Sequence, residues 1–190
     1  MIPVNKNIPI IILAAGDSTR LGKDKQSLPF RGTTLLEHAV ACSLRISAVK
    51  LVSRDETDTN KDVKVLKNSK ADEGMASSIR LGIEDSLNAD AVILMVCDQP
   101  FITSDILNNL IETYSNSGRG IVACSYDNTF GPPVLFSKKY FPELLQLKGD
   151  IGARKIIDQH FVDVALVDFP RGSIDIDTEA DYLKLSKIEA

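Results

Sequence analysis

Apolar positions follow two alternating patterns along this chain. Continuous apolar runs span residues 8–14 and 91–97, and both are dominated by Ile, Leu, Val and Ala. Runs without polar interruption are typical of central parallel strands, which are buried on both faces of a sheet. Shorter apolar segments predict further strands at residues 49–52, 63–66, 120–126, 133–136 and 162–167.

Between these segments, apolar residues recur at the three- and four-residue spacing of an amphipathic helix. Thr33 or Thr34 is a candidate N-cap of the first helix, and Thr103 or Ser104 of the third. Strands that alternate with helices predict an α/β fold, a three-layer Rossmann-like arrangement with helices on both faces of a mostly parallel sheet. No linker or repeat interrupts the pattern, so we expect a single domain over residues 1–190. The predicted helices span residues 33–44, 77–87, 103–114, 142–147, 152–159 and 178–186.

Composition narrows the function classes. The chain is 44% hydrophobic and 25% charged, which is typical of a folded globular protein and excludes a disordered tail, a collagen-like repeat or a small disulfide scaffold. Lys plus Arg total 22 against 26 Asp plus Glu, so the formal net charge is -4. No basic stripe surrounds the aromatic residues, so we expect no nucleic acid as a partner. An anionic ligand has to be held by a local cluster of cations and backbone amides.

The cellular compartment is inferred from the same sequence. No apolar run reaches the roughly 18 residues of a membrane span, so we expect no membrane contact. The first run is followed by the charged segment 16–25, which lacks a signal-peptide cleavage pattern. Cys42, Cys97 and Cys124 are far apart and form no CxxC pair, which argues against a zinc site or a disulfide framework. The sequence therefore predicts a cytoplasmic protein with reduced thiols.

The loop after the first strand has the composition of a phosphate cradle. It reads AAGDSTRLGKDK, in which small residues let backbone amides approach an anion and Arg20, Lys23 and Lys25 add positive charge. Five residues separate Gly16 from Gly22, and no Ser or Thr follows Lys23, so the loop is not a P-loop of the Walker type. Judged on glycine and charge alone, an ordinary surface loop with scattered cations is an equal alternative.

Residues 13–36 as a whole resemble the signature of the MobA-like NTP transferase family, L-A-A-G-x-S-x-R-M-G-x-x-K-x-L-x-P followed by a Gly and a Leu-Leu helix. Leu21 stands where Met is usual. The resemblance implies the nucleotidyltransferase version of the Rossmann-like fold. It also implies that Arg20 and Lys25 hold the triphosphate and act in catalysis. The residues that would cradle the nucleotide are Leu13, Ala14, Ala15, Gly16 and Ser18.

Asp98 directly follows the second buried strand. A carboxylate in that place is costly unless it is solvated, paired or bound to a metal, although capping of the next helix is an alternative. Asp98-Gln99-Pro100 resembles the family's D-Q-P motif, which implies that Asp98 binds Mg²⁺ and that Gln99 lies on the acceptor side. Residues 173–182 resemble the family's D-I-D-T-P-E-D-Y, which implies Asp177 as the second metal ligand and Asp175 as a supporting acceptor-side residue.

Two further segments match the family. Residues 68–82 resemble the part beside the nucleobase and imply contacts from Asn68, Gly74 and Ser78, although a plain helix N-terminus capped by a serine is an alternative. The segment GDIGAR resembles the family's G-D-x-G-A-R and implies that Arg154 meets the phosphate of the acceptor, although a surface arginine is nearly as good an interpretation. Gly131-Pro132-Pro133 departs from the usual G-H-P, which leaves the acceptor open.

The resemblance implies a Mg²⁺-dependent enzyme, closest to the molybdenum cofactor cytidylyltransferases, that transfers CMP from CTP to the phosphate of molybdopterin cofactor. Ala14-Ala15-Gly16 favours CTP, whereas Asp24 before Lys25 resembles the guanylyl branch. Transfer to another small phosphate, such as a sugar phosphate, is an alternative acceptor reaction. A non-catalytic carrier of nucleotide or cofactor is an alternative from another class. An apo-molybdoenzyme or its chaperone is a further candidate partner.

Overall fold

The computed structural model describes residues 6–16, 25–176 and 181–182. Its centre is a seven-stranded sheet in the order β5-β4-β1-β6-β8-β7-β9. β1 (Ile10–Ala14) pairs in parallel with β4 (Val49–Ser53) on one side and with β6 (Ala91–Val96) on the other. β5 (Val63–Lys67) pairs in parallel with β4. The two long apolar runs are thus central strands, as predicted, and the structure pairs them with each other.

The other half of the sheet contains one strand that runs opposite to its neighbours, β8. β8 (Thr129–Ser137) is antiparallel to both β6 and β7 (Ile121–Tyr126), and β9 (Val164–Asp168) pairs in parallel with β7 at the edge. The prediction of a mostly parallel sheet is therefore confirmed. The predicted strand at 133–136 was too short, because Gly131-Pro132-Pro133 hides the start of β8. Asp127 and Asn128, both with positive φ, form the turn that joins β7 to β8.

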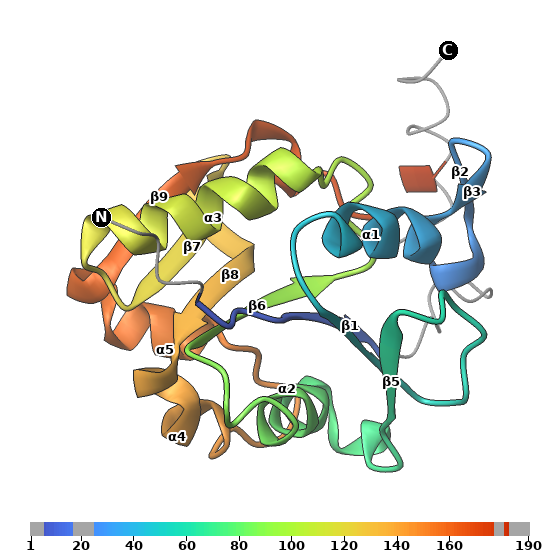
Figure 1. Ribbon diagram of the computed structural model, residues 1–190, viewed down its shortest axis with the longest axis horizontal. Helices are drawn as coiled ribbons and strands as arrows, with labels where there is room; N and C mark the ends of the chain where they lie inside the picture. The colour runs from blue at the N-terminus through green and yellow to red at the C-terminus, as the bar shows by residue number, and fades with distance from the viewer. Residues whose placement is uncertain (1–5, 17–24, 177–180, 183–190) are drawn as a thin grey trace.

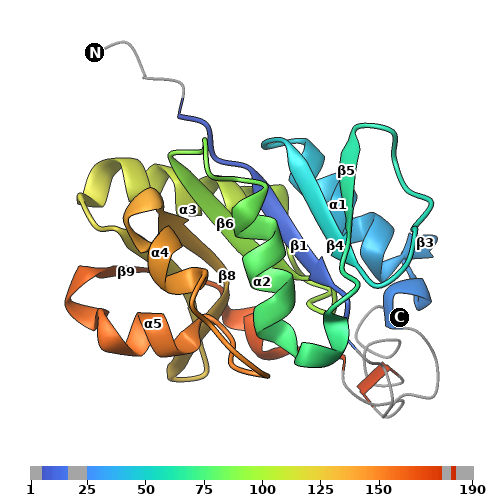
Figure 2. The same ribbon diagram turned by 90° about the horizontal axis from the view of Figure 1, so that it is seen from below.

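Helices cover both faces of the sheet and complete the predicted three layers (Figure 1). α1 (Leu35–Leu44) and α3 (Ser104–Ser117) pack on one face, where they share a core with Ile10 and Ile12. Figure 2 shows α2, α4 and α5 in front of the opposite face, where Ile11 joins their core. These helices span Met75–Glu84, Phe141–Leu144 and Arg154–Gln159.

Short elements connect the layers. β2 (Pro29–Phe30) and β3 (Thr33–Thr34) form a two-stranded hairpin before α1. Five 3-10 turns complete the described chain: η1 (Lys25–Ser27), η2 (Ala71–Glu73), η3 (Lys138–Tyr140), η4 (Phe161–Asp163) and η5 (Pro170–Ser173). Most of the predicted closing helix at 178–186 lies outside the described residues. Residues 181 and 182, the part of it that is described, are helical. Within the described ranges no helix is both long enough and apolar enough to cross a membrane.

The helix starts test the predicted caps. Thr34 caps α1 and forms a capping box with Glu37, and Thr103 caps α3 by accepting a hydrogen bond from the Ile106 amide. α2 differs, because it begins two residues before the predicted start and its N-cap is Gly74. The alternative of a serine cap for α2 is therefore wrong.

A polar network closes the sheet at the amino ends of β7 and β9. The Asp163 carboxylate accepts hydrogen bonds from the Tyr140 hydroxyl at 2.6 Å and from the Lys139 ammonium at 3.2 Å. Burial raises the pKa of Asp163, but hydrogen bonds from Tyr140, the Gly120 amide and Lys139 outweigh burial and hold that pKa below its ordinary value. The ionised carboxylate therefore stabilises the junction of η3, η4 and β7.

Replacing this carboxylate should make the protein less stable in a pH-dependent way. Asp163→Asn should lower the free energy of unfolding by about 1–2 kcal/mol at pH 7, because the charged acceptor is lost. Since the folded-state pKa is depressed, this contribution is present above the pKa of the unfolded chain, about 3.9, and is lost as pH falls through the folded-state value. Urea unfolding at pH 7 and pH 3 measures the free energy of unfolding of wild type and Asp163→Asn. The difference between these two free energies should be smaller at pH 3 than at pH 7.

A matched control is Asp158→Asn. The Asp158 carboxylate is 55% exposed and lies 3.9 Å from Arg154, so its replacement should change the free energy of unfolding by less than about 0.5 kcal/mol. An equal loss at both pH values for Asp163→Asn would contradict the role given to its ionised form.

Candidate active site

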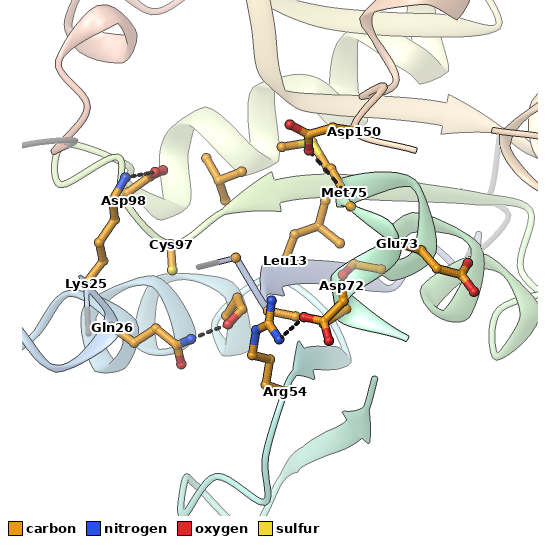
Figure 3. A pocket seen from close by; sticks show the side chains of 17 residues that line it. Leu13, Lys25, Gln26, Arg54, Asp72, Glu73, Met75, Cys97, Asp98 and Asp150 are labelled. Carbon is orange, nitrogen blue, oxygen red and sulfur yellow. Dashed lines mark hydrogen bonds and ion pairs between the residues drawn. The ribbon is translucent and has the colours of Figure 1, made fainter. Parts of the chain in front are cut away.

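A cavity of about 860 Å³ lies where three parallel strands end (Figure 3). The pairing aligns Ala14 with Ser53 and Leu13 with Val96, so β1, β4 and β6 end at one level. The next residues of each strand line the cavity: Ala15 and Gly16 after β1, Arg54 after β4, and Cys97 and Asp98 after β6. In parallel sheets ligands bind beyond these carboxyl ends. The predicted nucleotide-binding residues Leu13, Ala14, Ala15 and Gly16 all line this cavity.

Lys25 and Asp98 meet at one side of the cavity. The Lys25 ammonium lies 3.6 Å from the Asp98 carboxylate, and both side chains are largely buried. Gln26, next to Lys25 in η1, donates a hydrogen bond from its side chain to the Ala14 carbonyl and ties this turn to the end of β1. Two residues assigned to catalysis by the sequence are thus in contact. Thr103 caps the following helix, so the capping alternative for Asp98 is wrong.

Among the described residues, Asp98 is the predicted metal ligand, and it lines the cavity. The Ile176 amide donates to the Asp98 carbonyl at 3.1 Å, which brings the chain beside Asp98 one residue before Asp177. Asp177 itself lies outside the described residues, as do Ser18 and Arg20. The described ranges contain no cluster of three metal-ligating side chains. A carboxylate facing an open cavity, joined by phosphate oxygens and water, has the oxygen chemistry that Mg²⁺ prefers.

The segment predicted to face the nucleobase, residues 68–82, lies partly at the cavity and partly behind its wall. Gly74 and Ser78 line the cavity. Asn68 is buried behind this wall, where its side-chain amide donates to the hydroxyl oxygens of Ser77 and Ser78 at 2.8 and 3.0 Å. Its side-chain oxygen accepts from the Lys70 amide at 2.9 Å. In this structure Asn68 positions the wall that η2 and α2 form; its predicted contact with a ligand stays a prediction.

The loop before α5 packs directly on the start of α2. The Met75 amide donates to the Asp150 carboxylate at 3.3 Å, and the Ala76 amide donates to the Gly149 carbonyl at 3.1 Å. Gly74 has a φ of 94°, and a Cβ there would lie 2.7 Å from backbone atoms of Gly149 and Asp150. The first amides of α2 are therefore bonded within the protein. Asp150 and Met75 complete this side of the cavity (Figure 3).

The three predicted acceptor-side residues lie outside the cavity lining. Gln99 is buried, and its side-chain amide donates to the carbonyls of Pro132 at 3.1 Å and Gly172 at 2.8 Å. Its side-chain oxygen is buried and has no hydrogen-bond partner among the described residues. Asp175 is exposed. Gln99 thus ties β8 to η5 immediately beside Asp98.

Arg154 is held against the start of β8. Its guanidinium donates to the Thr129 hydroxyl at 2.8 Å and to the Phe130 carbonyl at 3.0 Å, and it stacks 4.6 Å from the Phe130 ring centre. Burial raises the pKa of Tyr126, the charge of Asp175 raises it further, and Arg154 acts in the opposite direction. Tyr126 is therefore within electrostatic range of both residues, although the sequence analysis did not select it.

Arg54, Asp72 and Asp150 line the cavity but were not predicted as site residues. Arg54 lies two residues beyond the strand predicted at 49–52, and only the alignment of the strand ends shows that it lines the cavity. Asp150 was inside the GDIGAR match, but its contact with Met75 joins segments far apart in the sequence. A long-range contact of this kind leaves no local pattern.

Comparison with known proteins identifies the family. The model of the MobA-like NTP transferase domain matches residues 10–164. The chain belongs to the MobA-like NTP transferase family. It is 30% identical to the purine catabolism protein PucB of Bacillus subtilis, with 90% of this chain and 92% of PucB covered. This family membership confirms the predicted resemblance and fold.

Relatives with named activities are more distant. The chain is 25% identical to a probable molybdenum cofactor guanylyltransferase of Carboxydothermus hydrogenoformans, with 96% and 97% of the two chains covered. It is 23% identical to the molybdenum cofactor cytidylyltransferase of Escherichia coli, with 93% and 94% covered. This MobA-like chain is an enzyme, a nucleotidyltransferase, and the alternative of a non-catalytic carrier is not supported.

Solved structures share this fold. The crystal structure of Rv0371c from Mycobacterium tuberculosis superimposes with a TM-score of 0.82 at 27% identity, covering 96% of this chain and 98% of that one. A complex of Rv0371c with manganese superimposes with a TM-score of 0.73 at 28% identity, covering 95% and 98%. The arrangement of strands around the cavity is therefore shared with solved proteins.

Gly74→Ala tests how the cavity wall is held. The change should lower the free energy of unfolding by about 2–4 kcal/mol, because a side chain at positive φ is strained and its Cβ would overlap backbone atoms. Gly118→Ala is a control for positive φ: Gly118 has a φ of 68° and a ψ of 7°, whereas Gly74 has a ψ of -176°, and a Cβ at Gly118 meets nothing within 4 Å. The control should cost only about 1–2 kcal/mol in urea unfolding. Equal costs for the two variants would contradict the contact between Gly74 and the loop before α5.

Proposed function

We propose that this nucleotidyltransferase transfers CMP from CTP to the phosphate of molybdopterin cofactor and releases pyrophosphate, with Mg²⁺ as its metal. The observation that carries the proposal is the meeting of Lys25 and Asp98 in the cavity where β1, β4 and β6 end. A cation and an acid at the same end of a cavity supply the two groups that a metal-bound triphosphate requires.

The nucleophile in this reaction is an oxygen of the acceptor phosphate. A terminal phosphate has a second pKa of about 6 and is largely ionised at pH 7, so no side chain has to remove a proton. Its oxygen attacks the α-phosphorus of the nucleotide as the bond to pyrophosphate breaks. The protein then has to align the two reactants and neutralise charge. Lys25, together with Arg20, is proposed to hold the departing pyrophosphate, and the backbone of residues 14–16 to hold the nucleotide.

Asp98 and Asp177 are proposed to hold the metal. Mg²⁺ would neutralise charge on the α-phosphate and on the entering oxygen when it is bound. The manganese complex of Rv0371c supports a divalent cation in this family. The Lys25 ammonium, which lies against Asp98 in this structure, is close enough to exchange its carboxylate partner for a phosphate. The pair therefore joins binding of the metal to binding of the triphosphate.

The choice of CTP rests on Ala14-Ala15-Gly16, whose backbone lines the cavity. Transfer of GMP from GTP is the second candidate, because Asp24 resembles the guanylyl branch and a relative carries the name of a guanylyltransferase. The acceptor is assigned from relatives named for the molybdenum cofactor. Gln99, Arg154 and Asp175 are proposed to form the acceptor side, since Gln99 directly follows Asp98 and all three residues interact with Tyr126.

Asp98→Asn should lower pyrophosphate release from CTP by about a hundredfold or more in the presence of Mg²⁺ and molybdopterin cofactor, because a metal ligand is lost. A coupled pyrophosphate assay measures the rate. Asp105→Asn, which removes an exposed acid in the first turn of α3, is the control and should keep the wild-type rate. Full activity of Asp98→Asn would contradict the proposed role of Asp98 as a metal ligand. Turnover of GTP but not of CTP would contradict CTP as the substrate and favour the guanylyl reaction.

A further inference from the structure

Arg54 occupies a fixed place at the cavity. It directly follows β4, and its backbone is anchored on both sides: the Asn68 amide donates to the Ser53 carbonyl at 2.8 Å, and the Ser53 hydroxyl donates to the Asp55 carbonyl at 2.6 Å. The side chain projects into the cavity (Figure 3) and is 32% exposed. A guanidinium in this place presents several N–H donors and no acceptor to whatever fills the cavity.

One partner of Arg54 on the cavity wall is Asp72. The Arg54 guanidinium donates to the Asp72 carboxylate at 2.6 Å. Asp72 belongs to η2, directly before the Gly74 turn, and its side chain is 87% exposed. An ion pair with so exposed a carboxylate contributes roughly 0–1 kcal/mol, so a ligand can displace it at small cost. A ligand can therefore replace Asp72 as a partner of Arg54, whereas the hydrogen bonds of Asn68 are buried.

Two charged pairs lie on different sides of the cavity. Figure 3 shows Lys25 with Asp98 on one side and Arg54 with Asp72 on another, with the ends of β1 and β6 between them. If phosphates bind at Lys25 and Asp98, as the proposed function requires, the nucleoside has to extend away from them along the cavity. Arg54 lines the cavity on another side from Lys25 and Asp98, so a base that extends to that side meets its guanidinium. This step rests on the proposed function.

We propose that Arg54 reads the nucleobase and that Asp72 is the partner it exchanges for the base. A group with only donors binds best to a base edge that presents two adjacent acceptors. Guanine offers N7 and O6, and cytosine offers O2 and N3. In adenine, the acceptor N7 lies next to the amino group, which is a donor. In uracil, the acceptor O2 lies next to the N3–H group, which is also a donor. Arg54 therefore favours cytosine or guanine nucleotides over those of adenine and uracil.

The test is the affinity of four nucleotides for four proteins. Dissociation constants of CTP, GTP, UTP and ATP with Mg²⁺ are measured by calorimetry for wild type, Arg54→Ala, Arg54→Lys and Lys70→Ala. Arg54→Ala should weaken the preferred nucleotide by about tenfold and the disfavoured ones little, because a charge-assisted hydrogen bond is lost. Arg54→Lys should lose most of the preference, since an ammonium lacks the planar fork. Lys70→Ala removes one exposed positive charge nearby and should leave all four constants unchanged.

Asp72→Asn tests the exchange. Removing the competing charge should tighten binding of the preferred nucleotide by about two- to threefold, the range expected for an exposed pair. Weaker binding by Asp72→Asn would overturn the exchange, because Asp72 would then act with the ligand and not against it.

A monophosphate series separates base from phosphate recognition. The preferred nucleoside monophosphate and triphosphate should lose affinity by the same factor in Arg54→Ala if Arg54 contacts the base. A loss confined to the triphosphate, or an unchanged preference among the four bases, would overturn the proposal while leaving the transferase activity intact. A wild-type protein that binds no nucleotide would overturn both this proposal and the proposed function.

Discussion

The parallel pairing of β1 with both β4 and β6 is the constraint on which the site depends. It aligns Ala14 with Ser53 and Leu13 with Val96, so three strands leave the sheet at one level. A slip of one residue in either pairing would reverse the direction of every following side chain. The cavity between Arg54 and Asp98 lies at this level because the two pairings hold the ends of the three strands side by side. Continuous apolar runs in β1 and β6 are the sequence counterpart of burial on both faces of the sheet.

Polar contacts then set the wall of the cavity that the sheet cannot supply. Asn68 is buried and bonds to the serines of α2, while the loop before α5 supplies Gly149 and Asp150 to the first amides of that helix. A buried polar side chain without partners would be costly, so these bonds are formed together with the fold. The result is a hydrogen-bonded wall that lines the same cavity as Lys25 and Asp98.

The sequence predicted those parts of the molecule whose signal is local. Buried central strands and the threonine caps of α1 and α3 follow from runs and caps of a few residues. The assignment of Lys25 and Asp98 to one site came from the family resemblance, because no local pattern links two residues so far apart in the sequence. The start of β8 was missed because its glycine and prolines look like a turn. The predicted start of α2 was too late because the first amides of this helix bond to a loop that is distant in the sequence. Arg54 was missed because an arginine after a short strand looks like any surface residue until the strands are aligned.

The measurement that tests the central claim most directly follows the two ends of the triphosphate. CTP radiolabelled at the α-phosphorus or at the γ-phosphorus is incubated with enzyme, Mg²⁺ and molybdopterin cofactor, and the products are separated. Attack at the α-phosphorus predicts that the α label enters the cofactor product and the γ label leaves as pyrophosphate. A γ label in the acceptor, or release of inorganic phosphate alone, would contradict nucleotidyl transfer at this cavity.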